Sequence, residues 1–348
     1  NTISNGREGI RIAAASALGG TYTVTGNILS NHSDFGLVIW DTVEDNRVFT
    51  GVATAISSTY SISNNTFSGN TRGGIDVTAN TCTGPSQQFT FSGNTIFNNP
   101  GPGITFESAC ETGGFPLPSI HSLTVSDNDI IQNGTASRPE GAALYLDSVG
   151  PATVTGNRIH NNGYSDAKSI IWLQPRDPGG FAQGAIVFED NQVSGNQATN
   201  TIFLTNDSGT HDIERNSIHD NNTTNDFKTY GAGHPWDPID LENNWWGANS
   251  EAFAESRIFH KNDDITFTNV DFIPILTAPP VSAPPALPTN VAAQTGPTTI
   301  ALSWSANPES DIAGYKVHYD TDAAGYPYAN STNVGNVASH TLAGLNTG

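Results

Sequence analysis

The stretch Ile62-Ser-Asn-Asn65-Thr-Phe67-Ser-Gly-Asn70 decides how this chain folds. It sets an apolar residue, an Asn, a second apolar residue and a second Asn at fixed spacing, and the short alternating strand Gly74-Ile75-Asp76-Val77 follows it. The pattern returns between Phe91 and Asn99 and many times afterwards; in the copy from Ile213 to Asn221, the expected following strand is Ile239-Asp240-Leu241. A unit that recurs at such intervals is one layer of a solenoid, because each layer buries its apolar face against the next.

The repeat predicts an all-β fold rather than a helical solenoid. Its strands are short, its apolar residues alternate, and its composition is rich in Gly, Asn, Thr and Ser. Stacking such coils at the strand spacing produces continuous inward stripes of Ile, Val, Leu and Phe. We therefore predict a right-handed parallel β-helix over residues 1–273, with about nine coils.

One Asn position is expected to form a structural ladder through the coils. A sharp bend between short strands leaves backbone groups without a ladder partner, and a stacked Asn tolerates the left-handed conformation and can bond the backbone of its own and the next coil. Consecutive members lie 25 to 38 residues apart. The predicted ladder residues are Asn27, Asn65, Asn94, Asn128, Asn157, Asn191, Asn216 and Asn244.

These residues give the chain a family resemblance. With its apolar-Asn repeats and the closing segment Asn243-Asn-Trp-Trp-Gly247, it resembles the parallel β-helix repeat family of pectate-lyase-like, carbohydrate-associated secreted proteins. The resemblance covers roughly residues 1–272. It implies the fold and an extracellular setting, but no particular activity, because many functions share this scaffold.

The C-terminal part has a different composition. Residues 274–288 form a Pro-rich, semi-rigid linker. Residues 289–348 are similar to a bacterial fibronectin type III module, in which Trp304 would be the core aromatic residue of an early strand. This module would be incomplete, and the chain opens inside a repeat at Asn1. We therefore expect both ends to be uncapped, and either to continue into a longer parent protein or to be covered by self-association with a neighbouring subunit.

Charge and cysteine content limit the partners and the compartment. The chain carries 33 acidic and 13 basic residues, a formal net charge of -20. Nucleic-acid binding needs clustered Lys and Arg, so we exclude it, and no apolar run is long enough to span a membrane. Cys82 and Cys110 fall in equivalent loops of adjacent coils, which predicts a disulfide and an extracellular or cell-surface location.

Strand parity predicts one chemically distinctive face. Between inward apolar residues, Tyr145, Trp172 and Phe203 should point outward and stack from coil to coil. Aromatic faces with polar neighbours such as Gln174 are typical of carbohydrate binding. The alternative is that the loop at residues 174–185 folds over these rings and buries them as a small satellite core.

Catalytic and metal sites are less clearly indicated. If the chain is an enzyme, Glu107, Asp147 and Arg176 are the candidate catalytic residues of a polysaccharide lyase or glycoside hydrolase, although no compact basic cluster supports a lyase. No metal site is predicted, but calcium remains possible. The acidic pairs that could ligate it are Asp127 with Asp129 and Asp263 with Asp264.

Three functions follow from these features. The first is a secreted or cell-surface protein with a structural or polysaccharide-binding role. The second is a polysaccharide lyase or glycoside hydrolase that acts on an extracellular glycan. The third is a subunit of an extracellular filament or sheath.

Overall fold

The computed structural model divides the chain into two units, Asn1–Pro284 and Pro285–Gly348. Their boundary falls within the segment expected to be a linker. The structure describes residues 1–14, 20–42, 58–80, 87–107, 111–112, 115–116, 121–135, 141–149, 151–175, 185–205, 211–230, 238–320 and 328–345.

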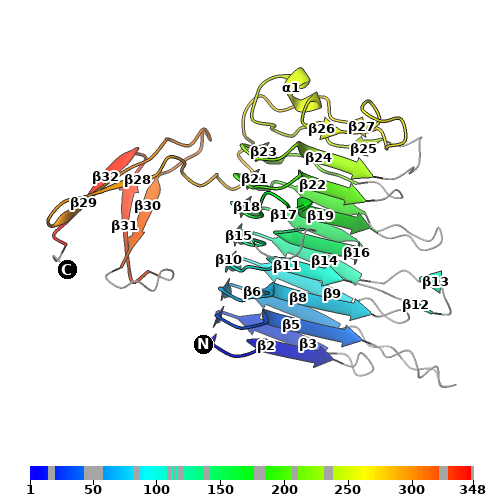
Figure 1. Cartoon of the computed structure of the whole chain (residues 1–348), viewed down its shortest axis with the longest axis horizontal. Helices are drawn as coiled ribbons and strands as arrows, with labels where there is room; N and C mark the ends of the chain where they lie inside the picture. The colour runs from blue at the N-terminus through cyan, green and yellow to red at the C-terminus, as the bar shows by residue number, and fades with distance from the viewer. Residues whose placement is uncertain are drawn as a thin grey trace. The chain divides into compact units, whose positions relative to one another are not determined.

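The first unit is a stack of parallel strands in three sheets (Figure 1). Sheet A contains β1 (Thr2–Ser4), β4 (Ile28–Ser30), β7 (Thr66–Ser68), β10 (Thr95–Phe97), β15 (Asp129–Ile131), β18 (Arg158–His160), β21 (Gln192–Ser194) and β23 (Ser217–His219). Sheet B contains β2 (Ile10–Ala14), β5 (Phe35–Thr42), β8 (Gly73–Asn80), β11 (Ile104–Glu107), β16 (Leu144–Val149), β19 (Ser169–Pro175), β22 (Asn200–Thr205), β24 (Asn225–Tyr230) and β26 (Ile258–Phe259). Sheet C contains β3 (Gly20–Thr25), β6 (Ser58–Ser63), β9 (Gln87–Ser92), β14 (His121–Ser126), β17 (Ala152–Thr155) and β20 (Ile186–Glu189).

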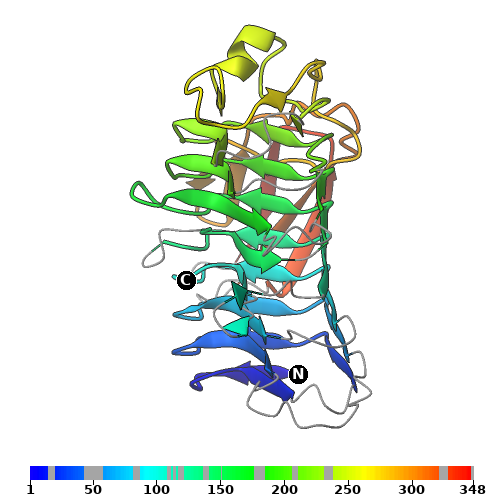
Figure 2. The same cartoon turned by 90° about the vertical axis from the view of Figure 1, so that its right-hand side faces the viewer.

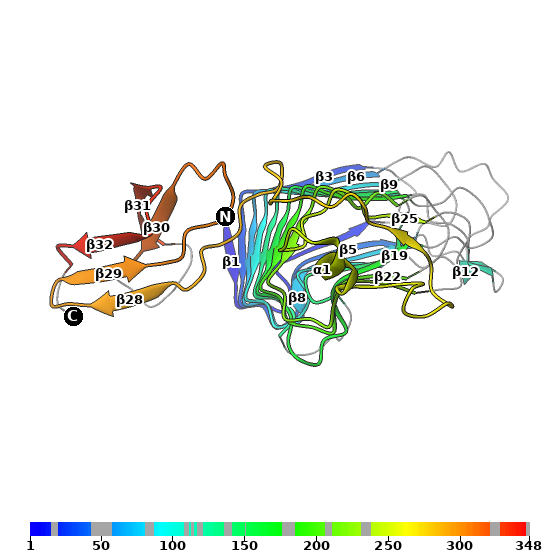
Figure 3. The ribbon, with the colours of Figure 1, turned by 90° about the horizontal axis from the view of Figure 1, so that it is seen from above.

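Most coils contribute one strand to each sheet, and equivalent strands lie one above another (Figure 2). Seen along the stack, the three sheets enclose a common interior (Figure 3). The repeat's apolar residues fill it: Phe67, Ile96 and Ile130 are register partners in sheet A and are fully buried. Two short pairs accompany the sheets, β12 (Glu111–Thr112) with β13 (Phe115–Pro116) and β25 (Ile239–Asp240) with β27 (Val270–Asp271).

The eight predicted ladder Asn residues form a continuous chain of hydrogen bonds. Asn128 is typical: its Nδ2 donates to Asn157 Oδ1 at 2.9 Å and to the Phe91 carbonyl at 2.9 Å. Its Oδ1 accepts from the backbone N–H and the Nδ2 of Asn94, at 2.9 and 3.0 Å. Each buried amide therefore satisfies backbone groups that the sheets leave unpaired at the bend between sheets C and A.

The ladder Asn was expected to adopt the left-handed conformation at this bend. In the structure the residue immediately before it does so instead. The ladder Asn keeps a negative φ and its side chain points into the stack, while the preceding residue makes the turn. The residues with positive φ at this place are Gly26, Asn64, Gly93, Asp127, Gly156, Asp190, Arg215 and Asn243.

A second ladder runs five residues further along each coil. Asn99 Nδ2 donates to Asn133 Oδ1 at 2.8 Å, and the other members continue in the same way. In the first coils His32 takes the place of an Asn: its backbone N–H donates to Asn70 Oδ1, and its Nδ1 accepts from the backbone of Gly6. The Asn members are Asn70, Asn99, Asn133, Asn162, Asn196 and Asn221.

The last coils differ from the expected order. The repeat that begins at Ile213 was expected to continue with a sheet B strand at Ile239–Leu241. In the structure β24 occupies that place, and β25 instead continues the sheet C side, where Asp240 bridges Asp212. Residues 231–237 lie outside the described part of the chain, and strand spacing alone could not show which apolar segment re-enters sheet B.

A short cap follows the last coil. Helix α1 (Glu251–Glu255) begins at Ser250, whose side chain accepts from the backbone of Phe253, and β26 then adds to the end of sheet B beside β24. Arg257 ties this cap to the coil below, because its Nε donates to Asp226 Oδ2 at 2.7 Å. Among the described residues, no helix is both long and apolar enough to cross a membrane.

The second unit has antiparallel strands. Strands β28 (Ala292–Thr295), β29 (Thr299–Ser303) and β32 (Ser339–Ala343) form one sheet, and β30 (Tyr315–Tyr319) pairs with β31 (Asn330–Gly335) in another. Trp304 packs edge-on against Tyr315 with ring centroids 5.3 Å apart. The Tyr315 hydroxyl also accepts from the backbone of Asn307, which links the two sheets through one aromatic pair.

Candidate functional site

The outward face of sheet B carries an aromatic row. In-register pairing of β16, β19 and β22 aligns Tyr145 with Trp172 and Trp172 with Phe203. Their strand neighbours on either side point inward and are fully buried, so these three rings face outward. The ring centroids are 6.1 Å apart for the first pair and 4.7 Å for the second. All three rings are half-buried, and residues 176–184 of the segment expected to fold over them lie outside the described part of the chain, so that alternative stays open.

The aromatic row continues further than the sequence indicated. Tyr230, 59% exposed at the end of β24, lies 6.4 Å from the Phe203 ring, and Phe267 lies 6.0 Å beyond Tyr230. Phe259 of β26 packs edge-on against Phe267 at 5.0 Å. We call Tyr145, Trp172, Phe203, Tyr230 and Phe267 the aromatic stripe. Its last two members could not be placed from the repeat, because Tyr230 belongs to β24, a strand that the repeat did not indicate, and Phe267 lies in the cap.

Polar side chains accompany the first two rings. The Tyr145 hydroxyl donates to Asp147 Oδ2 at 3.4 Å, and Trp172 Nε1 donates to Gln174 Oε1 at 3.2 Å. Both acceptors stand two residues further along their strands, so they point to the same face, and they are register partners of each other. The stripe therefore combines flat apolar surfaces with hydrogen-bonding groups, as a sugar ring requires.

Lys228 stands where a further aromatic residue would have completed the row. It pairs with Phe203 across β22 and β24. Its Nζ lies 4.4 Å from the Phe259 ring centroid and 5.4 Å from that of Phe267. A cation over aromatic faces is held by the ring quadrupoles, so Lys228 links the stripe to the cap.

The candidate catalytic residues are only partly placed. Glu107 and Asp147 are register partners in β11 and β16, half-buried on the outward face of sheet B. Arg176 lies outside the described residues, and so do Cys82 and Cys110, whose predicted disulfide stays a prediction. Thr105 of β11 is the register partner of Tyr145 and is fully buried.

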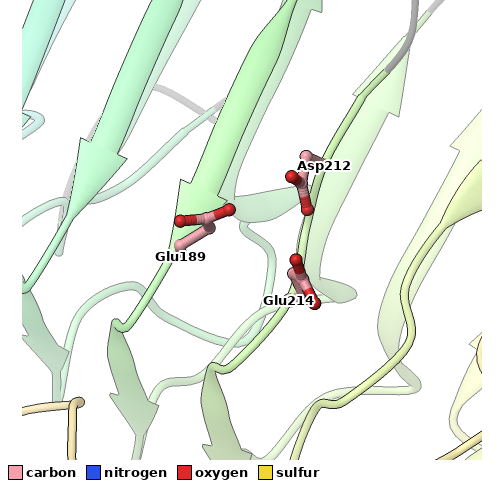
Figure 4. A group of neighbouring side chains, drawn as sticks. All are labelled: Glu189, Asp212 and Glu214. Atoms are coloured by element: carbon pink, nitrogen blue, oxygen red, sulfur yellow. The ribbon is translucent and has the colours of Figure 1, made fainter.

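A second cluster, which the sequence did not indicate, lies on sheet C. Glu189, Asp212 and Glu214 bring their carboxylate oxygens within 4.8 Å of one another (Figure 4). Two columns of acidic residues meet here. Asp212, Asp240 and Asp271 are aligned by strand register and form the first column. The second column, two residues further along each strand, consists of Glu189, Glu214 and Glu242. These segments are far apart in the sequence, and only the coil-to-coil register aligns them.

Arg215 offsets part of this charge. It contacts Glu189 through Nη2, Glu214 through Nη1 at 3.0 Å, and Asp190 through Nε at 3.2 Å. Burial, followed by the neighbouring Glu214 and Glu189 carboxylates, raises the pKa of Asp212 to about 6. Three such carboxylates could hold a hard divalent cation, but the salt bridges to Arg215 describe the cluster equally well.

The acidic pairs considered from the sequence serve turns and strand edges. Asp127 adopts the left-handed conformation before ladder residue Asn128, and Asp129 pairs with Arg158 at 2.9 Å. Asp263 accepts from the backbone of His260, whereas Asp264 accepts from Thr266. The carboxylates of Asp129, Asp263 and Asp264 therefore each have a structural hydrogen bond or ion pair in place.

Comparison with known proteins identifies the scaffold. Residues 1–137 match the family model described as a right handed beta helix region. The fold is a right-handed parallel β-helix. The three parallel sheets continue beyond the matched residues to β20, β23 and β26. No curated protein and no solved structure matches this chain. Since the β-helix hosts many functions, the activity has to be inferred from its surfaces.

Proposed function

We propose that this chain is a secreted or cell-surface β-helix protein that binds polysaccharide through the aromatic stripe on sheet B. The observation that carries this proposal is the alignment of Tyr145, Trp172 and Phe203 on successive coils, with Asp147 and Gln174 hydrogen-bonded beside them. Rings held at this spacing by strand register offer a preorganised surface, which reduces the entropy cost of binding an extended ligand.

The rest of the chain fits this role. The β-helix has about nine coils and resembles pectate-lyase-like, carbohydrate-associated proteins. The C-terminal unit is a partial fibronectin type III-like module, supported by its antiparallel strands and the Trp304–Tyr315 pair. Such a module would serve as a spacer or attachment domain.

Hydrolysis is the second candidate function. Glu107 and Asp147 are register partners on the face that bears the stripe. Adjacent parallel strands stand about 4.8 Å apart, and retaining glycosidases hold two carboxyl groups about 5 Å apart. The proposed binding face would then also be the catalytic face.

Binding and catalysis are tested together by incubating the protein with a panel of neutral and uronate polysaccharides. Trp172→Ala is expected to weaken binding at least about tenfold, because it removes the largest ring of the stripe. Trp40→Ala is the matched control: Trp40 is 46% exposed on the same sheet, in β5, several coils away from the stripe.

Binding is measured by affinity electrophoresis and calorimetry, with circular dichroism to establish that both variants fold. Equal binding by wild type and Trp172→Ala would overturn the proposal. Release of reducing ends or unsaturated uronate during incubation would identify an enzyme rather than a binding protein.

A further inference from the structure

The direction of the aromatic stripe sets the direction of its ligand. Tyr145, Trp172, Phe203 and Tyr230 come from four consecutive strands of sheet B, β16, β19, β22 and β24. The successive centroid separations are 6.1, 4.7 and 6.4 Å. A ligand that stacks on all of them must run across the strands, along the axis of the β-helix, and present one flat ring to each coil.

The negative charge of this face limits the charge that the ligand can carry. The whole chain has a formal net charge of -20, and Glu107 and Asp147 lie on the same face as the stripe. A polyanion would approach against this potential, and its attraction would depend on cations presented to it. A chain of hydroxyl-bearing rings would meet no such barrier.

Lys228, a described cation beside the stripe, already contacts two aromatic rings. The Lys228 ammonium stands over the Phe259 and Phe267 rings, at 4.4 and 5.4 Å from their centroids. Moving it toward a ligand carboxylate would cost these contacts. At the other end of the stripe, the hydrogen bonds of Tyr145 and Trp172 run to Asp147 and Gln174, whose oxygens can also accept hydrogen bonds from sugar hydroxyls.

We infer that the ligand of the aromatic stripe is an uncharged polysaccharide, bound along the helix axis with one sugar over each ring from Tyr145 to Tyr230. This inference rests on the proposed polysaccharide-binding function and adds the substrate class. It predicts that affinity rises with chain length until the stripe is covered and then levels off.

The test uses the full chain and two matched ligand series. Neutral β-1,4-linked gluco-, manno- and xylo-oligosaccharides, from dimers to hexamers, are compared with oligogalacturonates of the same lengths. Binding is measured by calorimetry from about 0.05 to about 0.5 M NaCl, because screening weakens attraction to a polyanion but leaves a neutral ligand unaffected.

The expected result is that at least one neutral series binds, gains affinity with length and is insensitive to salt. Tyr230→Ala should then lower the affinity for hexamers by at least about tenfold and leave that for dimers within about twofold, because dimers can occupy the Tyr145–Trp172 end. Tyr328→Ala, in the second unit and 44% exposed, is the matched control and should change neither.

Two results would overturn the inference and can be told apart. Salt-sensitive binding of oligogalacturonate that Trp172→Ala abolishes, with no neutral binding, would refute the substrate class and leave the proposed function standing. If Trp172→Ala binds every glycan as tightly as wild type does, the stripe is not the binding surface, and both proposals are refuted.

Discussion

Each interior asparagine of the ladder links its own coil to the coil below and to the coil above. A ladder Asn such as Asn128 bonds one coil below and one above, and both its donors and its acceptor lie out of reach of water. Buried polar groups that lose a partner cost more than the bond contributed, because the remaining partner is left desolvated. The ladders therefore fix the register of the coils as well as their stability.

Asn128→Ala is expected to lower the free energy of unfolding by about 3 kcal/mol, because four buried groups each lose one hydrogen bond. These groups are the backbone N–H and Nδ2 of Asn94, the Phe91 carbonyl and Asn157 Oδ1. Asn27→Ala is the matched control at the half-exposed start of the ladder, with an expected loss of about 1 kcal/mol. Denaturant unfolding measures both, and equal losses would contradict the role of burial in the ladder.

Asp212 makes the free energy of unfolding depend on pH. Its folded pKa of about 6 lies above the ordinary value near 3.9, so the folded state binds this proton more tightly than the unfolded chain. The resulting stabilisation is fully present below about pH 4 and is lost as the pH rises through about 6. Asp212→Asn should therefore stabilise the protein at neutral pH, by about 1 kcal/mol after allowance for solvent screening.

The measurement is denaturant unfolding of Asp212→Asn and wild type at about pH 7.5 and about pH 4, with Asp166→Asn as the exposed control. The increase in the free energy of unfolding of Asp212→Asn over wild type should shrink toward zero at the acidic pH. A gain of the same size at both pH values would show that carboxylate repulsion is not its cause.

At the scale of elements, the cap on the last coil depends on one buried ion pair. Asp226 of β24 is 2% exposed, and Arg257, just before β26, donates to it at 2.7 Å. The same guanidinium donates to the Thr223 carbonyl at 3.0 Å, while Thr201 Oγ1 donates to the second oxygen of Asp226. This network fastens β26 onto sheet B and so closes the interior of the β-helix at β24.

Arg257→Met is expected to destabilise the protein by about 3 kcal/mol, because it leaves the Asp226 carboxylate buried without a counter-charge. The double variant Arg257→Met/Asp226→Asn should recover more than half of this loss, since it removes the uncompensated charge and keeps the shape. Unfolding experiments and hydrogen exchange of β24 amides measure the effect. If single and double variants unfold alike, the cost comes from lost packing instead.

At the scale of the whole molecule, the chain combines a long scaffold with a small separate unit. Coils contact only their neighbours, so surface features must be built coil by coil, as the aromatic stripe on sheet B and the acidic columns on sheet C show. The formal net charge of the chain is -20, which would repel a polyanion but not the uncharged polysaccharide that we infer as the ligand of the aromatic stripe. The predicted self-association through the ends of the chain stays a prediction.

The sequence by itself determined the coil. Its apolar positions specify which side chains point inward, and Asn65, Asn94 and Asn128 stand where a buried amide must serve two coils at once, so local periodicity was sufficient. The same parity placed Trp172 outward beside Tyr145 and Phe203. These features depend on residues within one repeat, and strand alternation is a local rule.

Only the tertiary structure decided what happens between repeats. Steps of 25 to 38 residues mean that loops of different length return the chain to each sheet, and no local rule says which segment re-enters. For that reason β24 rather than Ile239–Leu241 joined sheet B, Tyr230 and Phe267 extended the stripe, and Asp212 met Glu189 and Glu214. Contacts across coils depend on register, and register is set when all the coils pack together.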